Sequence, residues 1–303
     1  ELDERRPDAV LVLGDTYTAP LVAMAARRHG VGVVHLEAGL RSFNGRSMEE
    51  INRRQMVALA TIHLAPTELA AAFLRDEGVA PERIRVVGSP IVDTLQASGV
   101  NRVPIARRAG VAFTAHRDTN VDDPDTLATL VSIVTALGAS VGTVTFPVHP
   151  RTRMRLQDSG LWDALAASPD VRLRDPLGYG AMLRLLAGSR LVVTDSGGLQ
   201  EEAAYFGVPA VVMRQSTPRW EGVVNGGAVL TGVDLDRVLS AARQLTGSAS
   251  ASRIATLPCA YGDGRTVSRV VTAFSDAALL DLLQPVEPDY RHSAPPLPAG
   301  VSL

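Results

Sequence analysis

The sequence predicts an α/β fold of two domains, each a parallel sheet with helices wound over both faces. Short apolar runs alternate with longer helix-like segments along most of the chain, which is typical of parallel strands joined by crossover helices. This alternation breaks at the polar, unpatterned stretch 98–104 and then restarts. The chain has 303 residues, which is enough for two domains that each bury a core.

The first set of elements lies before that break. Apolar runs predict strands at 9–13, 32–36, 62–65 and 84–87, with helices at 20–28, 48–60 and 67–77. The charged opening 1–6 resembles the end of a helix. Because a helix that feeds a parallel strand needs a strand before it, we expect an upstream part of this domain to be absent from the sequence.

The second set begins after the break. We expect strands at 110–115, 143–148, 171–173, 190–194 and 210–213, with helices at 124–137, near 161–166, at 179–187 and at 266–283. The predicted organisation is a first domain over 1–97, a second over 98–264, a helix over 265–284 that packs back on the first domain, and a Pro-rich, disordered tail over 285–303.

Composition excludes several classes of function. The net charge of −2 gives no general affinity for nucleic acid. All 30 basic residues are Arg, so lysine Schiff-base chemistry is excluded within this chain. One cysteine, Cys259, rules out an intrachain disulfide framework and a cysteine-rich metal site. Without an evident membrane span or signal peptide, we expect a cytoplasmic protein with no membrane partner.

Ionisable side chains follow five of the expected strands. A single one would more often be a helix cap or a solvated loop residue. Five together favour a ligand site, because ligands of parallel sheets bind at the carboxyl ends of strands. The residues are Asp15, His35 and Glu37, His116 and Arg117, His149 and Arg151, and Asp195 and Ser196.

The stretch Thr194–Glu202 places two glycines where the buried run Leu191–Val193 turns into a helix. The first N–H groups of a helix are unpaired and carry the positive end of its dipole. Glycine lets a phosphate approach that backbone closely. Two acids one turn further on could reach a sugar hydroxyl. The stretch therefore predicts a pocket for a nucleotide diphosphate.

A second pair of acids, Glu49 and Glu50, opens another expected helix. Acids in a first turn often only complement the helix dipole. Together with Asp15 and Glu37 they could instead form a carboxylate cluster. Acid–base work on a carbon acid needs such groups, with pKa values that burial pushes apart.

Several motifs in the same order, from Pro7 to about Phe274, closely resemble UDP-N-acetylglucosamine 2-epimerases. The resemblance implies a GT-B-like fold, with two Rossmann-like domains and the active site in the cleft between them. It also implies a homodimeric cytoplasmic enzyme that interconverts UDP-GlcNAc and UDP-ManNAc without a redox cofactor or metal, through elimination of UDP to a 2-acetamidoglucal and its re-addition. The matching stretches are Gly14–Thr16, His35–Arg41, Glu49–Arg53, Ala65–Glu68, Thr114–Arg117, Pro147–Arg151, Thr194–Glu202 and Tyr261–Gly264.

The resemblance also assigns roles to residues. Matches to the family's catalytic groups are the carboxylates Asp15, Glu37 and Glu49 and the catalytic or phosphate-binding His116. Matches to its UDP and sugar contacts are the diphosphate-binding Ser196, Gly197 and Gly198, the ribose-binding Glu202, and Arg219, Glu221, His149, Arg41, Asn52 and Arg53.

The sequence departs from the family pattern at four places. The family's opening Gly-Thr-Arg-Pro-Glu loop has no match. Thr119 stands where the family has Glu, and Met48 where it has Pro. Within Thr217–Glu221, Pro218 and Trp220 replace a Glu and a Pro. We interpret Met48 as drift and Trp220 as a sign of altered sugar specificity.

Three alternatives to the non-hydrolysing epimerase remain open. A hydrolysing relative would let water capture the intermediate and release free ManNAc and UDP. A GT-B glycosyltransferase would need an acceptor groove but not the three carboxylates. An inactive sugar-nucleotide binder is the fourth possibility, given the missing opening motif.

Overall fold

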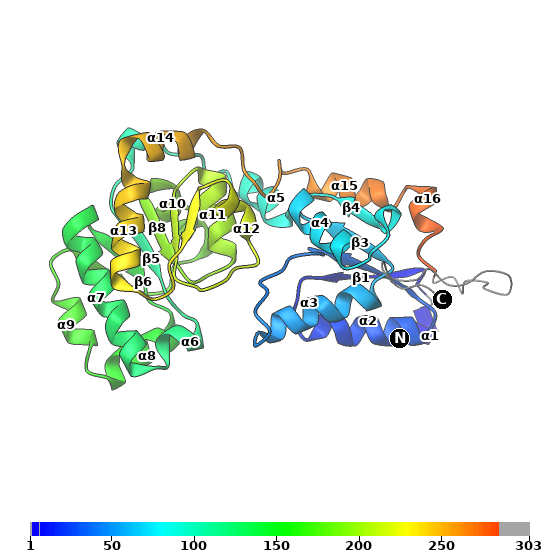
Figure 1. Ribbon diagram of the computed structural model, residues 1–303, viewed down its shortest axis with the longest axis horizontal. Coiled ribbons are helices and arrows are strands. Elements are labelled where there is room, and N and C mark those ends of the chain that lie inside the picture. The colour runs from blue at the N-terminus through cyan, green and yellow to red at the C-terminus, as the bar shows by residue number, and fades with distance from the viewer. Residues whose placement is uncertain (1, 6, 285–303) are drawn as a thin grey trace, which may run out of the picture.

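The computed structural model describes residues 2–5 and 7–284, and within them two parallel sheets form two domains (Figure 1). The first domain lies on the right of Figure 1 and the second on the left. A short helix α1 (Leu2–Arg5) precedes the first sheet. The α/β class with two parallel sheets is therefore confirmed. The expected tail over 285–303 lies outside the described residues.

The first sheet contains four parallel strands in the order β1-β2-β3-β4. They are β1 (Ala9–Leu13), β2 (Gly32–Leu36), β3 (Ile62–Ala65) and β4 (Ile84–Val86). The helices that join them are α2 (Thr18–Arg28), α3 (Met48–Leu59) and α4 (Glu68–Asp76). Small residues of α2 and Met56 of α3 pack on one face of β1 and β2. These bounds lie within two residues of the expected ones.

The second sheet has six parallel strands in the order β10-β9-β8-β5-β6-β7. The strands are β5 (Val111–Thr114), β6 (Val144–Pro147), β7 (Val171–Arg174), β8 (Leu191–Thr194), β9 (Ala210–Val212) and β10 (Ala228–Leu230). The chain runs outward in both directions from the neighbours β5 and β8. That reversal marks the topological switch point at which ligands of doubly wound sheets bind.

Alternate residues of β8 supply the two cores of the second domain. Leu191 and Val193 pack with helices α7 (Pro124–Val141) and α13 (Leu235–Thr246) on one face. Val192 packs with α10 (Tyr179–Gly188) and α11 (Gly198–Phe206) on the other. Both faces of the strand are buried, which explains why its sequence is an unbroken apolar run.

The helix α7 has a length and composition that alone would suffice to cross a membrane. We expected no such stretch from the sequence. Its Leu130, Ile133 and Leu137 are buried in the core under the second sheet, and hydroxyls on its exposed face, such as that of Thr135, bond back to carbonyls one turn earlier. α7 is thus an amphipathic core helix of the second domain.

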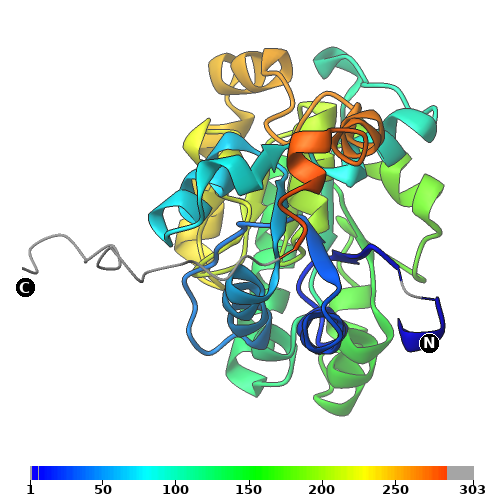
Figure 2. The ribbon, with the colours of Figure 1, turned by 90° about the vertical axis from the view of Figure 1, so that its right-hand side faces the viewer.

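The chain returns to the first domain after the second sheet is complete (Figure 2). Asp93 in α5 (Pro90–Ala97) accepts hydrogen bonds from the N–H groups of Thr266 and Val267, both at 3.0 Å, and so caps α15 (Thr266–Ala273). α15 and α16 (Ala277–Leu280) then pack Ala273 and Leu279 on the face of the first sheet opposite α2.

The expected single helix over 266–283 is wrong, because it is two helices. The chain leaves the helical path at Phe274, and the Asp276 carboxylate caps the second helix by accepting from the N–H of Ala278 at 3.1 Å. Other elements were not predicted at all. They are η1 (Pro81–Arg83), α5, η2 (Ile105–Arg107), α6 (Asp118–Val121), α8 (Pro150–Asp158), α12 (Trp220–Val224), β10, α13 and α14 (Ser248–Thr256). The helix expected near 161–166 is α9 (Trp162–Ala166).

Candidate functional site

Residues that follow β5 and β8 meet around one buried carboxylate, Asp195. Its side chain is 0% exposed, and its Oδ2 accepts from the backbone N–H groups of His116 at 3.0 Å and Arg117 at 2.9 Å and from the side-chain amide of Asn120 at 3.1 Å. Its Oδ1 lies 3.0 Å from Nδ1 of His116. Burial disfavours the Asp195 anion, but the bonds from His116 and Arg117 outweigh it and keep its pKa below the usual value.

Asp195 thereby fixes the orientation of the His116 ring. With Nδ1 facing the carboxylate, Nε2 is the nitrogen left to face a ligand. His116 is 41% exposed, and its ring centroid lies 5.7 Å from that of His149. His149 itself caps α8, where its Nδ1 accepts from the N–H of Arg151 at 3.2 Å.

The predicted diphosphate turn lies beside this pair. Gly197 is the N-cap of α11 and Gly198 is its first residue. A Cβ on either glycine would make only ordinary contacts, 3.9 Å to Arg219 and 3.8 Å to Ile91. Neither has a positive φ, so the fold itself does not require glycine there. Close approach of a ligand to the backbone is the physical reason that remains.

The turn is braced by neighbouring polar side chains. Ser196 donates its N–H to the hydroxyl of Thr194 at 3.0 Å, and the amide of Gln200 donates to the carbonyl of Ser196 at 2.9 Å. The hydroxyl of Thr217 donates to Gln200 at 2.9 Å. These bonds connect the turn to the segment that carries Arg219 and Glu221.

Glu37, at the end of β2, brings a carboxylate from the first domain to this turn. Its Oε2 lies 3.7 Å from Nη2 of Arg219 in the second domain. Burial raises the pKa of Glu37, and the Arg219 cation opposes that rise. Glu37 also has a φ of 64°, in the left-handed region. Such strain in a non-glycine residue is typical of functional sites.

Asp15, at the end of β1, is held by residues of α3. The guanidinium of Arg53 donates to its carboxylate, and the side-chain amide of Asn52 donates to its backbone carbonyl at 2.8 Å. The buried ring of His35 donates from Nε2 to the carbonyl of Gly14 at 2.8 Å and so fixes the turn that precedes Asp15. Asn52 and Arg53, predicted to bind substrate, therefore also orient Asp15.

Glu49 and Glu50 have different surroundings although they are adjacent. Glu49 is exposed and accepts from the hydroxyl of Ser47, which is the main cause of its lowered pKa. Glu50 is 1% exposed and accepts from the backbone N–H groups of Ser42 at 2.8 Å and Phe43 at 3.2 Å. Glu50 thus holds the loop between β2 and α3, and Glu49 is the acid of the pair that faces solvent.

The structure gives Arg41 an internal position rather than an open one. Its side chain is 0% exposed, and its Nε donates to Glu77 at 2.7 Å while Nη2 donates to the other oxygen of the same carboxylate. Its Nη1 donates to the carbonyl of Leu40 at 2.6 Å. The guanidinium predicted to contact substrate is therefore already occupied within the first domain.

The two remaining acids of the prediction, Glu202 and Glu221, are both buried. Burial raises the pKa of Glu202 to about 7, although a hydrogen bond with Tyr179 opposes the shift. Glu221 accepts from the hydroxyl of Thr67 across the domain boundary, and burial raises its pKa as well. Glu221 therefore joins the two domains directly.

Two residues near the turn were assigned no role from the sequence. Asp195 was placed at a strand end but given no role. The sequence does not show that its carboxylate accepts hydrogen bonds from three N–H donors. Arg214 has a buried Nη1 with no hydrogen-bond partner. Burial and, to a smaller extent, the cations of Arg117, Arg53 and Arg219 together lower the pKa of Arg214 to about 10. Its place two residues after β9 is the one signal that could have identified it.

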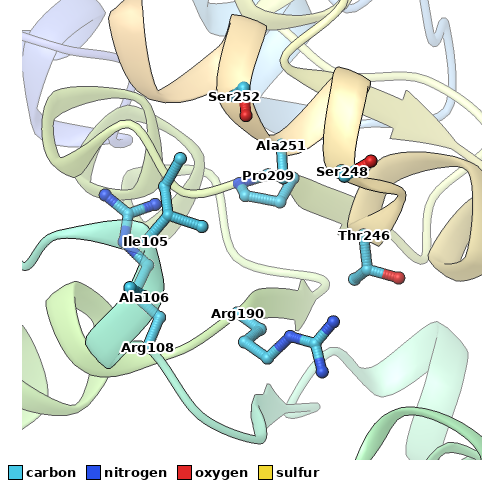
Figure 3. Close-up of a pocket in the computed structure, with 9 residues that line it drawn as sticks. All are labelled: Ile105, Ala106, Arg108, Arg190, Pro209, Thr246, Ser248, Ala251 and Ser252. Atoms are coloured by element: carbon cyan, nitrogen blue, oxygen red, sulfur yellow. The ribbon is translucent and has the colours of Figure 1, made fainter.

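No group of three or more His, Cys, Asp or Glu side chains is arranged to hold a metal within the part of the chain that the structure describes. A separate cavity of about 430 Å³ lies in the second domain beside η2 and α14 (Figure 3). Arg108, Arg190 and Ser248 are among the residues that line it, and none of the predicted site residues does. The Arg108 guanidinium is engaged with the carbonyls of Val103, Phe206 and Gly207.

Comparison with known proteins identifies relatives that match most of the chain. A profile of the UDP-N-acetylglucosamine 2-epimerase family matches residues 1–275. The chain is 36% identical over 275 residues to the UDP-2,3-diacetamido-2,3-dideoxy-D-glucuronate 2-epimerase of Pseudomonas aeruginosa, a match that covers 88% of this chain and 74% of that protein. It is 36% identical over 250 residues to the UDP-N-acetylglucosamine 2-epimerase of Methanocaldococcus jannaschii, covering 78% and 68% respectively.

A solved structure supports the same assignment. The crystal structure of Methanocaldococcus jannaschii UDP-GlcNAc 2-epimerase in complex with UDP-GlcNAc and UDP matches with a TM-score of 0.79 at 33% identity, over 90% of this chain and 77% of that one. The GT-B-like fold that the motifs implied is confirmed. The chain belongs to the UDP-N-acetylglucosamine 2-epimerase family.

Proposed function

We propose that this protein epimerises UDP-N-acetylglucosamine at C2 to UDP-N-acetylmannosamine. One observation carries the proposal: the half-buried Glu37 carboxylate of the first domain lies 3.7 Å from Arg219, whose guanidinium lies against Gly197 in the diphosphate turn. A group that can take a proton thus adjoins a cation that can stabilise a departing diphosphate.

The proposed reaction has two steps, an elimination of UDP and its re-addition. A carboxylate removes the C2 proton while the C1–O bond breaks, so UDP leaves with the bonding pair and a C1=C2 double bond forms. UDP then returns to C1, and a proton is delivered to the opposite face of C2. Asp15, Glu37 and Glu49 are the proposed proton carriers.

The second domain supplies the other half of the proposed site. The N–H groups of the Ser196–Gly198 turn, the His116 ring and Arg219 stabilise the negative charge of the departing diphosphate. Glu202 accepts from the ribose hydroxyls. Closing the domains around the intermediate keeps water from the reactive double bond.

Incubation with UDP-GlcNAc in D₂O, followed by NMR of C2–H, tests the proposal. Deuterium at C2 together with UDP-ManNAc supports it. Free ManNAc and UDP would instead identify a hydrolysing epimerase. A complete absence of exchange would contradict both and favour a glycosyltransferase or an inactive sugar-nucleotide binder.

The name of one relative points to a second candidate substrate. The Pseudomonas aeruginosa protein is named for a 2,3-diacetamido uronate sugar rather than for UDP-GlcNAc, and this chain has Pro218 and Trp220 beside Arg219. We therefore propose the same C2 chemistry on such a UDP-sugar as the alternative. Parallel D₂O assays with both UDP-sugars, compared by kcat/KM, distinguish the two substrates.

The homodimer and the cytoplasmic location implied by the resemblance are further proposals. They rest on the family alone. Analytical ultracentrifugation of the purified chain tests the first, and fractionation of the source cells tests the second.

A further inference from the structure

The sequence placed Glu201 within reach of a sugar hydroxyl, but in the structure its carboxylate holds Arg219 in place. Glu201 lies in the first turn of α11, and its side chain is 5% exposed. Its Oε1 accepts from Nε of Arg219 at 2.7 Å, and its Oε2 accepts from the hydroxyl of Ser89 at 2.6 Å. Both oxygens of one buried carboxylate are therefore used, one toward each domain.

Ser89 connects this pair to the first domain. It lies between β4 and α5, where the chain leaves the first sheet. Its own N–H donates to the carbonyl of Tyr261 at 2.8 Å, and the Tyr261 hydroxyl donates to the backbone carbonyl of Arg219 at 3.2 Å. The side chain and the backbone of Arg219 are thus both tied, through one intermediate residue each, to Ser89.

A second nitrogen of the Arg219 guanidinium, Nη2, faces the proposed reaction centre. This atom lies 3.7 Å from Glu37, and the guanidinium Cζ lies 3.9 Å from the position that a Cβ on Gly197 would occupy. The cation therefore contacts two carboxylates, Glu201 through Nε and Glu37 through Nη2, while it lies against the diphosphate turn. Its side chain is 13% exposed, so water screens these charges weakly.

Glu201 has two physical effects on this arrangement. Its bond to Nε fixes the plane of the guanidinium, which could otherwise rotate to pair fully with Glu37. Its charge also repels that of Glu37 and contributes to the raised pKa of Glu37. Both effects keep Glu37 free to accept a proton and Arg219 free to meet a diphosphate.

We propose that Glu201, anchored by Ser89, is a positioning residue that holds Arg219 over the diphosphate turn and limits its pairing with Glu37. The proposal rests on the proposed epimerase function for its kinetic consequences only. Its consequence for the Glu37 carboxyl concerns the free protein and can be measured whether or not the protein turns over UDP-GlcNAc.

The test compares Glu201→Gln with a matched control, Glu82→Gln, which changes an exposed acid in η1. The titration of the Glu37 carboxyl is followed by ¹³C NMR in the protein without ligand. Glu201→Gln is expected to lower the Glu37 midpoint, because a repelling charge is lost and Arg219 pairs more fully with Glu37. The kcat for C2 exchange is expected to fall by about 10- to 100-fold, as misplaced catalytic groups do, while the Kd for UDP changes less.

A second variant, Ser89→Ala, keeps both charges and removes only the anchor. It is expected to lower kcat severalfold with little effect on the Glu37 midpoint. If Glu201→Gln does not fold, this variant decides whether the anchored Glu201 positions Arg219. A Glu201→Gln protein whose Glu37 midpoint equals that of Glu82→Gln would overturn the proposal, and so would Ser89→Ala turning over like the control. If the wild type shows no C2 exchange, the epimerase proposal fails, and the Glu37 midpoint alone then decides the role of Glu201.

Discussion

Trp220 of the second domain donates its indole N–H to the backbone carbonyl of Arg41 in the first domain at 2.8 Å. The indole ring lies 6.5 Å, centroid to centroid, from that of Phe43. The proline that the family has at this position could not make the bond. Trp220, which we interpreted from sequence as a specificity change, is thus a contact that joins the domains beside the proposed sugar site.

Trp220→Phe is expected to weaken the contact between the two domains, because it removes the bond from the indole N–H to Arg41. One hydrogen bond is worth about 1 kcal/mol, which corresponds to roughly a fivefold rise in the KM for UDP-GlcNAc. Initial-rate kinetics measure the change. Trp162→Phe, which alters the other tryptophan, stacked under Arg153 within the second domain, is the control and should leave KM unchanged.

Asp15→Asn and Glu37→Gln are each expected to abolish C2 deuterium exchange while UDP still binds. Loss of a proton carrier lowers the rate by at least about 100-fold, whereas the diphosphate contacts belong to the second domain. NMR gives the exchange rate and calorimetry gives the Kd for UDP. Asp8→Asn, at an exposed acid before β1, is the control. Exchange that survives both changes would show that the carboxylates are assigned wrongly.

Arg214→Met is expected to affect ligand binding and stability in opposite directions. Arg214 has a buried Nη1 without a partner and three neighbouring Arg cations, so its removal leaves the free protein as stable or more stable. A diphosphate would lose a charged donor worth about 1.5–3 kcal/mol, and the Kd for UDP should rise by about 10- to 100-fold. Thermal unfolding without and with UDP measures both effects. The exposed Arg172→Met serves as control, and a UDP affinity equal to that of this control would exclude Arg214 from the diphosphate site.

The raised pKa of Glu202 predicts that the free energy of unfolding depends on pH. Because burial raises its pKa to about 7, the folded protein retains a proton that the unfolded chain loses near the ordinary glutamate value. Its ionisation therefore lowers the free energy of unfolding as pH rises between those two values, and each unit of pKa shift corresponds to about 1.4 kcal/mol. Glu202→Gln should accordingly gain stability over the wild type from about pH 5 to pH 7 and keep a constant advantage above that range. Urea unfolding at several pH values measures the difference, and a pH-independent difference would contradict the raised pKa.

The pairing of Arg41 with Glu77 predicts that loss of this partner lowers stability and leaves ligand binding unchanged. Glu77→Gln removes the partner of a guanidinium that is 0% exposed, and an uncompensated buried charge costs about 3 kcal/mol. The free energy of unfolding in urea should fall by that amount while the Kd for UDP stays unchanged. If UDP binding weakens instead, Arg41 takes part in the substrate site after all.

The sequence motifs predicted which residues form the candidate site but did not show which charged side chains pair with one another. Because the strand ends of a parallel sheet meet at one edge, Asp15 could be placed with Glu37, and His116 with Ser196, from their positions alone. Nothing in the pattern distinguishes Arg41, which pairs with Glu77 inside one domain, from Arg219, which faces Glu37 across two. Such distinctions depend on contacts between residues far apart in the chain.

The prediction of helices and strands was limited in the same way, by contacts that the sequence does not show. Unbroken apolar runs such as Leu191–Val193 gave nearly correct strands, because both faces of these strands are buried. The break at Phe274 was missed because the flanking residues keep an apolar pattern through both α15 and α16. The helices α13 and α14 were missed although Asp234 caps the first of them by accepting from the N–H of Arg237 at 2.9 Å.

The return of α15 and α16 to the first sheet has a consequence for biosynthesis. One face of that sheet, including Val34, Ile62 and Leu64, is covered by residues that the ribosome makes only after the whole second domain. The amino-terminal domain therefore cannot complete its core when it leaves the exit tunnel. The second domain, continuous in sequence, becomes the first unit able to fold fully, and the usual order of co-translational folding is reversed.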